Sequence, residues 1–201
     1  MIFPQVSCLL SRMNEHIHIE ERQRIARILN GNHEEYAYFV NAYSGQLIDF
    51  TSRMVQDRKD AEELAQDAFV KAYRSLGTFG FQSSFYTWLC RIAYHESLNH
   101  LKRQKVHYVD IDDTPLADEE ISDMELSTGL EERILLLEEA IDDLSPTEQM
   151  LVHLFYYKER PLREIAFIME MKPNTVANRL HRIRKKLLRI IQGKENGQSE
   201  R

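Results

Sequence analysis

The chain has 201 residues, 43% hydrophobic and 29% charged, which is the composition of a folded protein with room for two small domains. It contains no run of about 18 apolar residues, which excludes a membrane-spanning helix, and two cysteines are too few for a disulfide framework or a zinc site of their own. The formal net charge of −6, taken as a whole, argues against a nucleic-acid partner.

Apolar residues recur at three- and four-residue spacing through the first half of the chain, which predicts helices. We expect these helices over residues 20–29, 34–54, 60–76 and 84–105. Asp60 followed by Glu63 has the form of a capping box, so the third helix is predicted to begin at Asp60, and Gly77 to end it. A short loop over residues 78–83 then leads into the fourth helix.

Residues 106–129 interrupt this periodicity with acidic residues, Pro115, Ser and Thr, which predicts a flexible acidic linker. Residues 109–145 contain fourteen Asp or Glu and one Arg, a net charge of −13. Residues 77–108 carry +3 and residues 173–201 carry +6. The total charge therefore conceals two basic segments on either side of an acidic one.

Helical periodicity returns in the second half, over residues 130–144, 146–158, 161–170 and 174–192. Ser145 followed by Pro146 and Glu148 is typical of a helix start, with proline at the first helical position. Neither an internal repeat nor a series of strands is visible. We therefore predict an all-α fold of two helical domains, with a frayed tail over residues 193–201.

A short helix from Leu162, a tight connection and a basic helix from Asn174 together form a helix-turn-helix pattern. The outer face of the second helix presents side chains that can reach base edges in the major groove, namely Thr175, Asn178, Arg179 and Arg182. Residues further along suit phosphate contacts: Arg184, Lys185, Lys186 and Arg189. A solvated charged face is the alternative, but these basic residues have no acidic partner four residues away.

The string NTVANRLHRIRKKL is similar to the second DNA-binding domain of bacterial sigma factors. DAEELAQDAFVKAYRSL resembles the sigma helix that binds the clamp of core RNA polymerase. FGFQSSFYTWLCRIAYHESLNHLKRQK resembles the segment that melts and reads the −10 promoter element. Because three motifs occur in the family's order, the chain resembles the extracytoplasmic-function (ECF) group of the sigma-70 family over about residues 22–192.

The resemblance implies a role for each domain. Residues 1–21 would be an extension, 22–105 a domain for core polymerase and the −10 region, 106–129 the linker, and 130–192 a −35 domain. Core-polymerase binding is assigned to Asp60, Glu63, Leu64, Gln66, Asp67 and Phe69. Contacts to −10 DNA, including capture of a flipped base, are assigned to Phe79, Gln82, Ser83, Ser84, Tyr86, Trp88, Arg91, His95, Asn99, Lys102 and Arg103. Contacts to −35 DNA are assigned to Arg163, Thr175, Asn178, Arg179, Arg182, Lys185 and Lys186.

Several of these residues also fit a purely structural role. Periodicity alone favours an ordinary surface helix with an apolar inner face over residues 60–76, and it favours core packing over base stacking for Trp88. His95 and Asn99 stand where the family usually has Asn and Asp, which leaves the −10 preference open. Glu170 stands where the family often has Gly, at a cost of about 1 kcal/mol if the turn needs a positive φ. Residues 1–19 have no counterpart, and Met13 is a second candidate start.

No catalytic motif is present, so we expect neither an enzyme nor a cofactor or metal. The string HESLNH lacks the second histidine at i+4 that a helical zinc motif requires. The implied partners are core RNA polymerase, promoter DNA and, as a candidate antagonist, an anti-sigma factor. Without the cationic start of a signal peptide, a cytoplasmic location is expected. Two alternatives are an ordinary helix-turn-helix regulator and an interaction adaptor that binds no promoter.

Overall fold

The structure is a computed structural model that describes residues 19–55, 57–104 and 130–199. These residues form helices and turns and include no strand, in agreement with the predicted all-α class. They divide into two compact units, with residues 19–52 and 57–98 in the first and residues 53–55, 99–104 and 130–199 in the second. The predicted linker, residues 106–129, lies outside the described residues. No helix in the described part of the chain is long and apolar enough to cross a bilayer.

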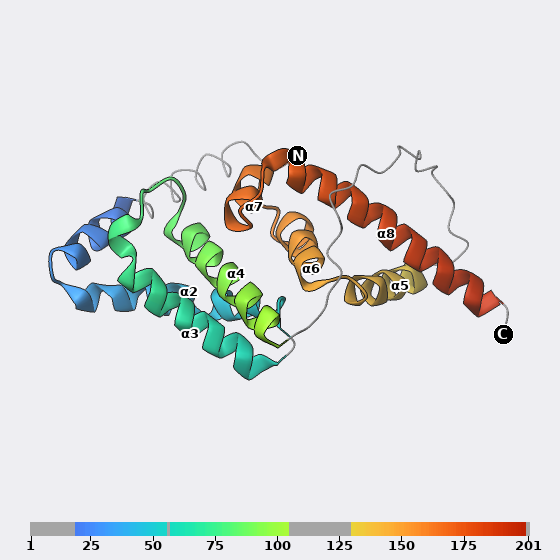
Figure 1. Cartoon of the computed structure of the whole chain (residues 1–201), viewed down its shortest axis with the longest axis horizontal. Coiled ribbons are helices and arrows are strands. Elements are labelled where there is room, and N and C mark those ends of the chain that lie inside the picture. Colours follow the sequence, from blue (N-terminus) through green and yellow to red (C-terminus); the bar gives the residue numbers. More distant parts are fainter. Residues whose placement is uncertain (1–18, 56, 105–129, 200–201) are drawn as a thin grey trace. The chain divides into compact units, whose positions relative to one another are not determined.

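The first unit is built on an aromatic core between helices. A helix over residues 19–29 precedes a 3-10 turn η1 (His33–Glu35), α2 (Tyr36–Thr51), α3 (Arg58–Arg74), a 3-10 turn η2 (Leu76–Thr78) and α4 (Phe85–Arg103) (Figure 1). The rings of Phe39 on α2 and Phe85 on α4 lie 4.2 Å apart between centroids. The Tyr36 hydroxyl donates to the Phe69 carbonyl at 2.7 Å, which joins α2 to α3. Large aromatic side chains thus fix the start of α4, where the predicted −10 loop ends.

The start of α3 differs from its prediction. Asp57, in an extended conformation, is the N-cap, and its carboxylate accepts the backbone N–H of Lys59 at 2.7 Å and of Asp60 at 3.3 Å. Asp60 therefore lies in the first turn, where its charge favours the positive end of the helix. The helix ends at Arg74 with Ser75 as its C-cap, and Gly77 belongs to η2 instead of ending α3.

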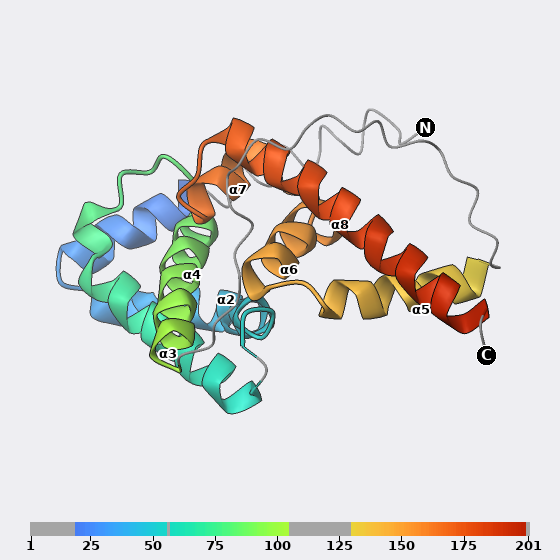
Figure 2. The same ribbon diagram turned by 45° about the vertical axis from the view of Figure 1, so that its right-hand side comes forward.

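The second unit packs three short helices against a long one. It consists of α5 (Leu130–Asp142), α6 (Pro146–Val152), a π-turn η3 (His153–Tyr157), α7 (Leu162–Ile168) and α8 (Pro173–Ser199). Helices α5, α6 and α7 all contact α8, which runs past each of them (Figure 2). Val176, Leu180 and Ile183 form a buried stripe in the first half of α8, and Leu136 and Ala140 of α5 cluster with Ile191 further along it.

One helix boundary in this unit agrees with its prediction and another does not. Ser145, Pro146 and Glu148 form the predicted start of α6, and the Ser145 and Glu148 side chains make a reciprocal capping box. Helix α8, by contrast, continues to Ser199, well beyond the predicted end at Gln192. The tail predicted to be frayed from residue 193 is therefore helical up to Ser199.

Candidate nucleic-acid interface

The loop between η2 and α4 is shaped by three aromatic rings. Phe79 is buried, and its ring lies 4.9 Å from that of Trp88 and 4.8 Å from that of Phe81. Phe81 has a φ of +54°, a conformation that side chains with a Cβ rarely adopt, and its ring is 37% exposed. The Arg22 guanidinium, from the helix over residues 19–29, stands 5.0 Å from the Phe81 ring centroid. The loop is thus held against the first helix by stacking and a cation–π contact.

A pocket of about 340 Å³ opens between this loop and the first helix. Its apolar walls include Ile25, Phe79 and Phe85, all of which are buried. Its polar lining consists of Glu21, Arg22, Gln82, Ser83 and Ser84. Aromatic walls with a few polar groups are the arrangement in which flipped bases are held.

The predicted −10 residues of the loop divide between packing and exposure. Phe79 and Trp88 pack on each other, and Trp88 is half-buried, which gives Trp88 a packing role without placing it in the core. Ser84 caps α4, because its hydroxyl accepts the Thr87 backbone N–H at 3.0 Å. The Tyr86 hydroxyl donates to the Gln46 carbonyl at 3.2 Å. Gln82 is exposed and Ser83 is half-buried, which leaves these two as the loop's accessible polar side chains from the predicted set.

Further along α4, the predicted residues form one stripe. Trp88, Arg91, His95, Asn99 and Lys102 recur at three- and four-residue spacing, so they lie along one face of the helix. Asn99 and Lys102 are exposed, and so is Arg103 beside the stripe. Among the described residues no group of three or more His, Cys, Asp and Glu is placed to hold a metal.

The predicted polymerase-binding set on α3 is only partly accessible. Leu64 and Phe69 are both buried at 6% exposure and belong to the core of the first unit, which favours a supporting role over direct contact with a partner. Glu63, Gln66 and Asp67 are exposed, and Asp60 is half-buried. Val70, which sequence reasoning did not single out, is 46% exposed on the same helix. The middle of α3 therefore exposes two acidic side chains, Gln66 and the apolar Val70, whereas basic side chains are exposed toward both ends of the helix, namely Arg58, Lys59, Lys71 and Arg74.

The helix-turn-helix has an apolar inner face. Ile165, Ala166 and Ile168 of α7 are buried with the apolar stripe of α8. The turn carries Glu170 at a φ of +54°, and the Met171 backbone N–H donates to the Ala166 carbonyl at 2.9 Å. The turn therefore does need a positive φ at Glu170, which is the condition under which a strain cost was expected.

The outer face of α8 retains four of the predicted DNA contacts. Asn178 is exposed, and Thr175, Arg179 and Arg182 are half-buried, in the first three turns of the helix. Arg163 on α7 is also exposed. These side chains are polar or basic and lie off the buried stripe, as groove contacts require.

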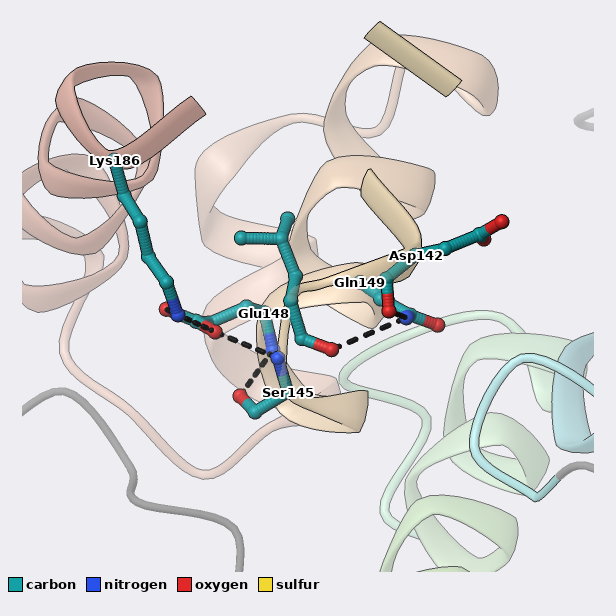
Figure 3. Close-up of polar contacts among 6 residues, drawn as sticks. Asp142, Ser145, Glu148, Gln149 and Lys186 are labelled. Atoms are coloured by element: carbon teal, nitrogen blue, oxygen red, sulfur yellow. Dashed lines mark hydrogen bonds and ion pairs between the residues drawn. The ribbon is translucent and has the colours of Figure 1, made fainter. Parts of the chain in front are cut away.

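Two predicted phosphate contacts on α8 lie against the rest of the unit, one of them buried and the other half-buried. Lys185 is only 8% exposed. The Lys186 ammonium donates to both carboxylate oxygens of Glu148, at 2.9 and 3.1 Å, and Figure 3 shows it reaching from α8 to the first turn of α6. Because α8 is flanked by α5, α6 and α7, its middle turns face protein over much of their circumference. Arg184 and Arg189 are the predicted phosphate contacts that are exposed.

Three features of the pocket were not found from the sequence. Glu21 is 3% exposed, and it accepts a hydrogen bond from the Tyr43 hydroxyl of α2. Burial and this bond raise the pKa of Tyr43, so the phenol stays protonated. Arg22 and Phe81 complete the set. In the sequence Glu21 and Arg22 sit in the charged run EERQR, which is indistinguishable from a solvated face.

Comparison with known proteins assigns both units. The family model Sigma-70 region 2 matches residues 39–106, and the model Sigma-70, region 4 matches residues 134–187. The RNA polymerase sigma-H factor of Pseudomonas aeruginosa is 30% identical over 186 residues, which cover 86% of this chain and 94% of that protein. The ECF RNA polymerase sigma-E factor of Escherichia coli strain K12 is 30% identical over 177 residues, 84% of this chain and 92% of that protein.

Two solved structures share the fold. One is the sigma factor RpoE in complex with the anti-sigma factor NepR from Bartonella quintana, with a TM-score of 0.55, 18% identity and coverage of 79% of this chain and 98% of that one. The other is CnrH in complex with the cytosolic domain of CnrY, with a TM-score of 0.58, 19% identity and coverage of 86% and 97%. At these identities the likeness supports the fold alone.

The matched regions follow one another in the order that the sequence motifs indicated. Region 2 includes α2 to α4 and the aromatic loop, and region 4 includes the helix-turn-helix. The first half of the chain is thus not the sensor domain of an ordinary helix-turn-helix regulator. Sigma factors are initiation factors and not enzymes. The chain therefore belongs to the sigma-70 family, as an ECF sigma factor that directs promoter-specific transcription initiation by RNA polymerase.

Proposed function

We propose that the two units read the promoter by different means. The first turns of α8 bind duplex −35 DNA in the major groove, with Arg179 and Asn178 at base edges. The observation that carries this proposal is the polar and basic face of α8, Thr175, Asn178, Arg179 and Arg182, which lies off the buried stripe of Val176, Leu180 and Ile183. Arg184 and Arg189, exposed further along, then contact phosphates.

The loop pocket of the first unit captures an unpaired base of the −10 region in this proposal. Extruding a base from a duplex costs a few kcal/mol, which is recovered in a shaped pocket with aromatic walls. The exposed side chains of α4, Asn99, Lys102 and Arg103, supply polar and cationic contacts for the rest of the strand. Phe79 is a wall of this pocket, and Trp88 supports it by packing against the Phe79 ring.

The exposed face of α3 is the proposed contact with core polymerase. Glu63, Gln66, Asp67 and Val70 are accessible on it. Glu63 and Asp67 in the middle of α3 suit a basic partner surface, because opposite charges steer the encounter, and Val70 adds apolar burial. Leu64 and Phe69 contribute by fixing this helix on the core of the unit.

The remaining elements follow from this division of work. The acidic segment over residues 106–129 connects the two readers, and the chain works in the cytoplasm, where bacterial polymerase meets the chromosome. An anti-sigma factor, the class of partner in the Bartonella complex, is the proposed antagonist. A protein that suppresses the transcript in the reconstituted reaction below would identify this antagonist, whereas failure of every candidate to do so would count against it.

One reconstituted reaction tests the assignment. The purified chain is added to sigma-free core polymerase on templates from its own genome, and promoter-specific run-off transcripts are expected. Duplex binding by the chain without polymerase, together with no transcript, would indicate an ordinary regulator. Neither binding nor transcript would indicate an adaptor that keeps the fold but reads no promoter.

A further inference from the structure

A buried carboxylate lines the proposed base pocket. Glu21 comes from the helix over residues 19–29, is 3% exposed and accepts a hydrogen bond from the Tyr43 hydroxyl. Burying a carboxylate is costly unless it is hydrogen-bonded, and Tyr43 supplies one such bond. A carboxylate offers about four lone-pair directions, so it can hold the Tyr43 hydroxyl and still accept a proton donor from a ligand.

The rest of the lining suits a flat heterocycle whose edge faces Glu21. Ile25, Phe79 and Phe85 are apolar walls, and the exposed ring of Phe81 lies at the mouth with the Arg22 guanidinium over it. Gln82 and Ser83 add neutral polar groups that can both donate and accept. The carboxylate is the one anionic side chain among the lining residues, and it accepts hydrogen bonds without donating any.

We propose that Glu21 is a specificity-determining residue that selects a −10 base carrying an exocyclic amino group and rejects thymine. This inference rests on the proposed base capture in the same pocket. Cytosine and adenine present an N–H₂ donor where thymine presents the O4 acceptor, and Glu characteristically accepts from the cytosine N4 group. When thymine O4 faces the Glu21 carboxylate, two hydrogen-bond acceptors meet in a poorly solvated site. Neither oxygen then receives a hydrogen bond, which is unfavourable.

A purely structural Glu21 would behave differently. If its role ended at the bond to Tyr43, replacing it would lower the stability of the first unit without changing which base is selected. Base preference at a single promoter position is therefore the measurement that distinguishes the two roles, whereas a loss of stability is expected from both.

The first experiment uses the unmodified chain. Holoenzyme is assembled from the full chain and core polymerase and transcribes a template library randomised across the −10 region, and the productive templates are sequenced. We expect one position at which amino-bearing bases exceed thymine by about tenfold or more, the effect of one good base contact. Thymine equal to or above the amino-bearing bases at every selected position would overturn the inference. Absence of transcripts from all templates would instead overturn the proposed base capture, and this inference with it.

The second experiment varies the Watson–Crick edge of the base. Where cytosine is selected, the non-template strand is synthesised with 5-methylcytosine or thymine at that position, since these two bases share the methyl group and differ at the Watson–Crick edge. Where adenine is selected, the pair is adenine and purine, which lacks the amino group. We expect about a tenfold loss of transcript on removing the amino group. Equal transcription from both templates would overturn the inference without any change to the protein.

The third experiment changes Glu21 itself. Glu21→Gln keeps the size and one acceptor oxygen but adds an N–H₂ donor, so thymine should become acceptable to within about threefold at that position and at no other. Tyr43→Phe is the matched control, because it removes the bond to Glu21 and keeps the carboxylate; the preference against thymine should persist. Thermal unfolding of both variants separates folding from selection. Unchanged rejection of thymine by folded Glu21→Gln would overturn the inference.

Discussion

In the proposed function, the pocket of the first unit and the outer face of α8 read DNA in two contrasting ways. The pocket is concave, walled by buried aromatic rings, and includes a single buried carboxylate. The α8 face is a convex helix surface with exposed or half-buried polar and basic side chains. Exposed charges are screened by salt, whereas buried ones are screened much less. We therefore expect the base selectivity of the pocket to change little with salt concentration. The affinity of α8 for DNA should fall as the salt concentration rises.

The same contrast divides α8 along its length. Arg179 and Arg182 stand on its outer face, whereas Lys186 one turn later is paired with buried Glu148 of α6. Glu148 also accepts the Ser145 backbone N–H at 2.7 Å, so it joins the start of α6 to α8. A lysine in a basic run can thus be part of the fold while its neighbours belong to the DNA-reading face.

The largest expected effect tests that division. Lys186→Ala should lower the free energy of unfolding of the second unit by about 2–3 kcal/mol, because it leaves Glu148 buried without its cationic partner. Thermal or urea unfolding of the full chain measures this. Glu148→Gln combined with Lys186→Ala should cost less than the sum of the two single changes. Arg184→Ala, at an exposed neighbour, is the control and should stay within about 0.5 kcal/mol of the parent.

The opposite outcome would extend the proposed DNA-binding face of α8 to Lys186. If Lys186→Ala left stability unchanged but weakened binding to every DNA sequence and lowered the salt dependence, Lys186 would be a phosphate contact. That was the expectation from the sequence alone, and the bond to Glu148 is the reason for replacing it.

The next effect separates base contacts from phosphate contacts on α8. Arg179→Ala should weaken holoenzyme binding to its preferred −35 sequence by about 2 kcal/mol and relax selection at one position. Arg184→Ala should weaken all sequences alike and reduce the salt slope by about one. Holoenzyme titrations on −35 variants at several salt concentrations measure both. Identical behaviour of the two variants would remove the distinction between them.

The helices and the domain order follow from the sequence because they depend on local patterns. Apolar spacing predicts α2 to α8, and Ser145-Pro146 predicts the start of α6, since a cap acts within one turn. The start of α3 was misplaced because Asp57 and Asp60 are both acceptable caps, and only the extended backbone at Asp57 distinguishes them. Local pattern does not decide between two cap residues of equal preference that lie three positions apart.

The site is less predictable because its parts meet through tertiary packing. Family motifs assign Leu64 and Phe69 to polymerase binding without separating residues that touch a partner from those that hold the helix in place. Glu21 lies about 60 residues before the loop that it faces, a separation that no helical or turn pattern spans. Lys186 on α8 pairs with Glu148 on α6. The absence of acidic residues at i±4 on α8 therefore does not predict whether Lys186 has an acidic partner.

A smaller effect distinguishes loop residues that stabilise the fold from those that contact the −10 strand. Ser84→Ala should lower the stability of the first unit by about 1 kcal/mol, because the Thr87 backbone N–H loses its capping acceptor. Gln82→Ala, at an exposed loop position, should leave stability within about 0.5 kcal/mol and act on −10 binding instead. Unfolding and −10 strand binding are measured on both. A stable Ser84→Ala variant with impaired strand binding would make Ser84 a contact after all.

The smallest effect concerns the turn that sets the angle of α8. Glu170 holds a φ of +54°, which costs a residue with a Cβ about 1–2 kcal/mol, whereas glycine pays about 0.5–1 kcal/mol more entropy on folding. Glu170→Gly should therefore exceed Glu170→Ala in stability by about 0.5–1 kcal/mol. Both variants lose the Glu side chain, so their difference reports the backbone alone. Equal stability of the two variants would mean that the turn relaxes without strain. A gain in Glu170→Gly, with −35 binding unchanged, would mean that the strained backbone at Glu170 is not needed to aim α8 at the major groove.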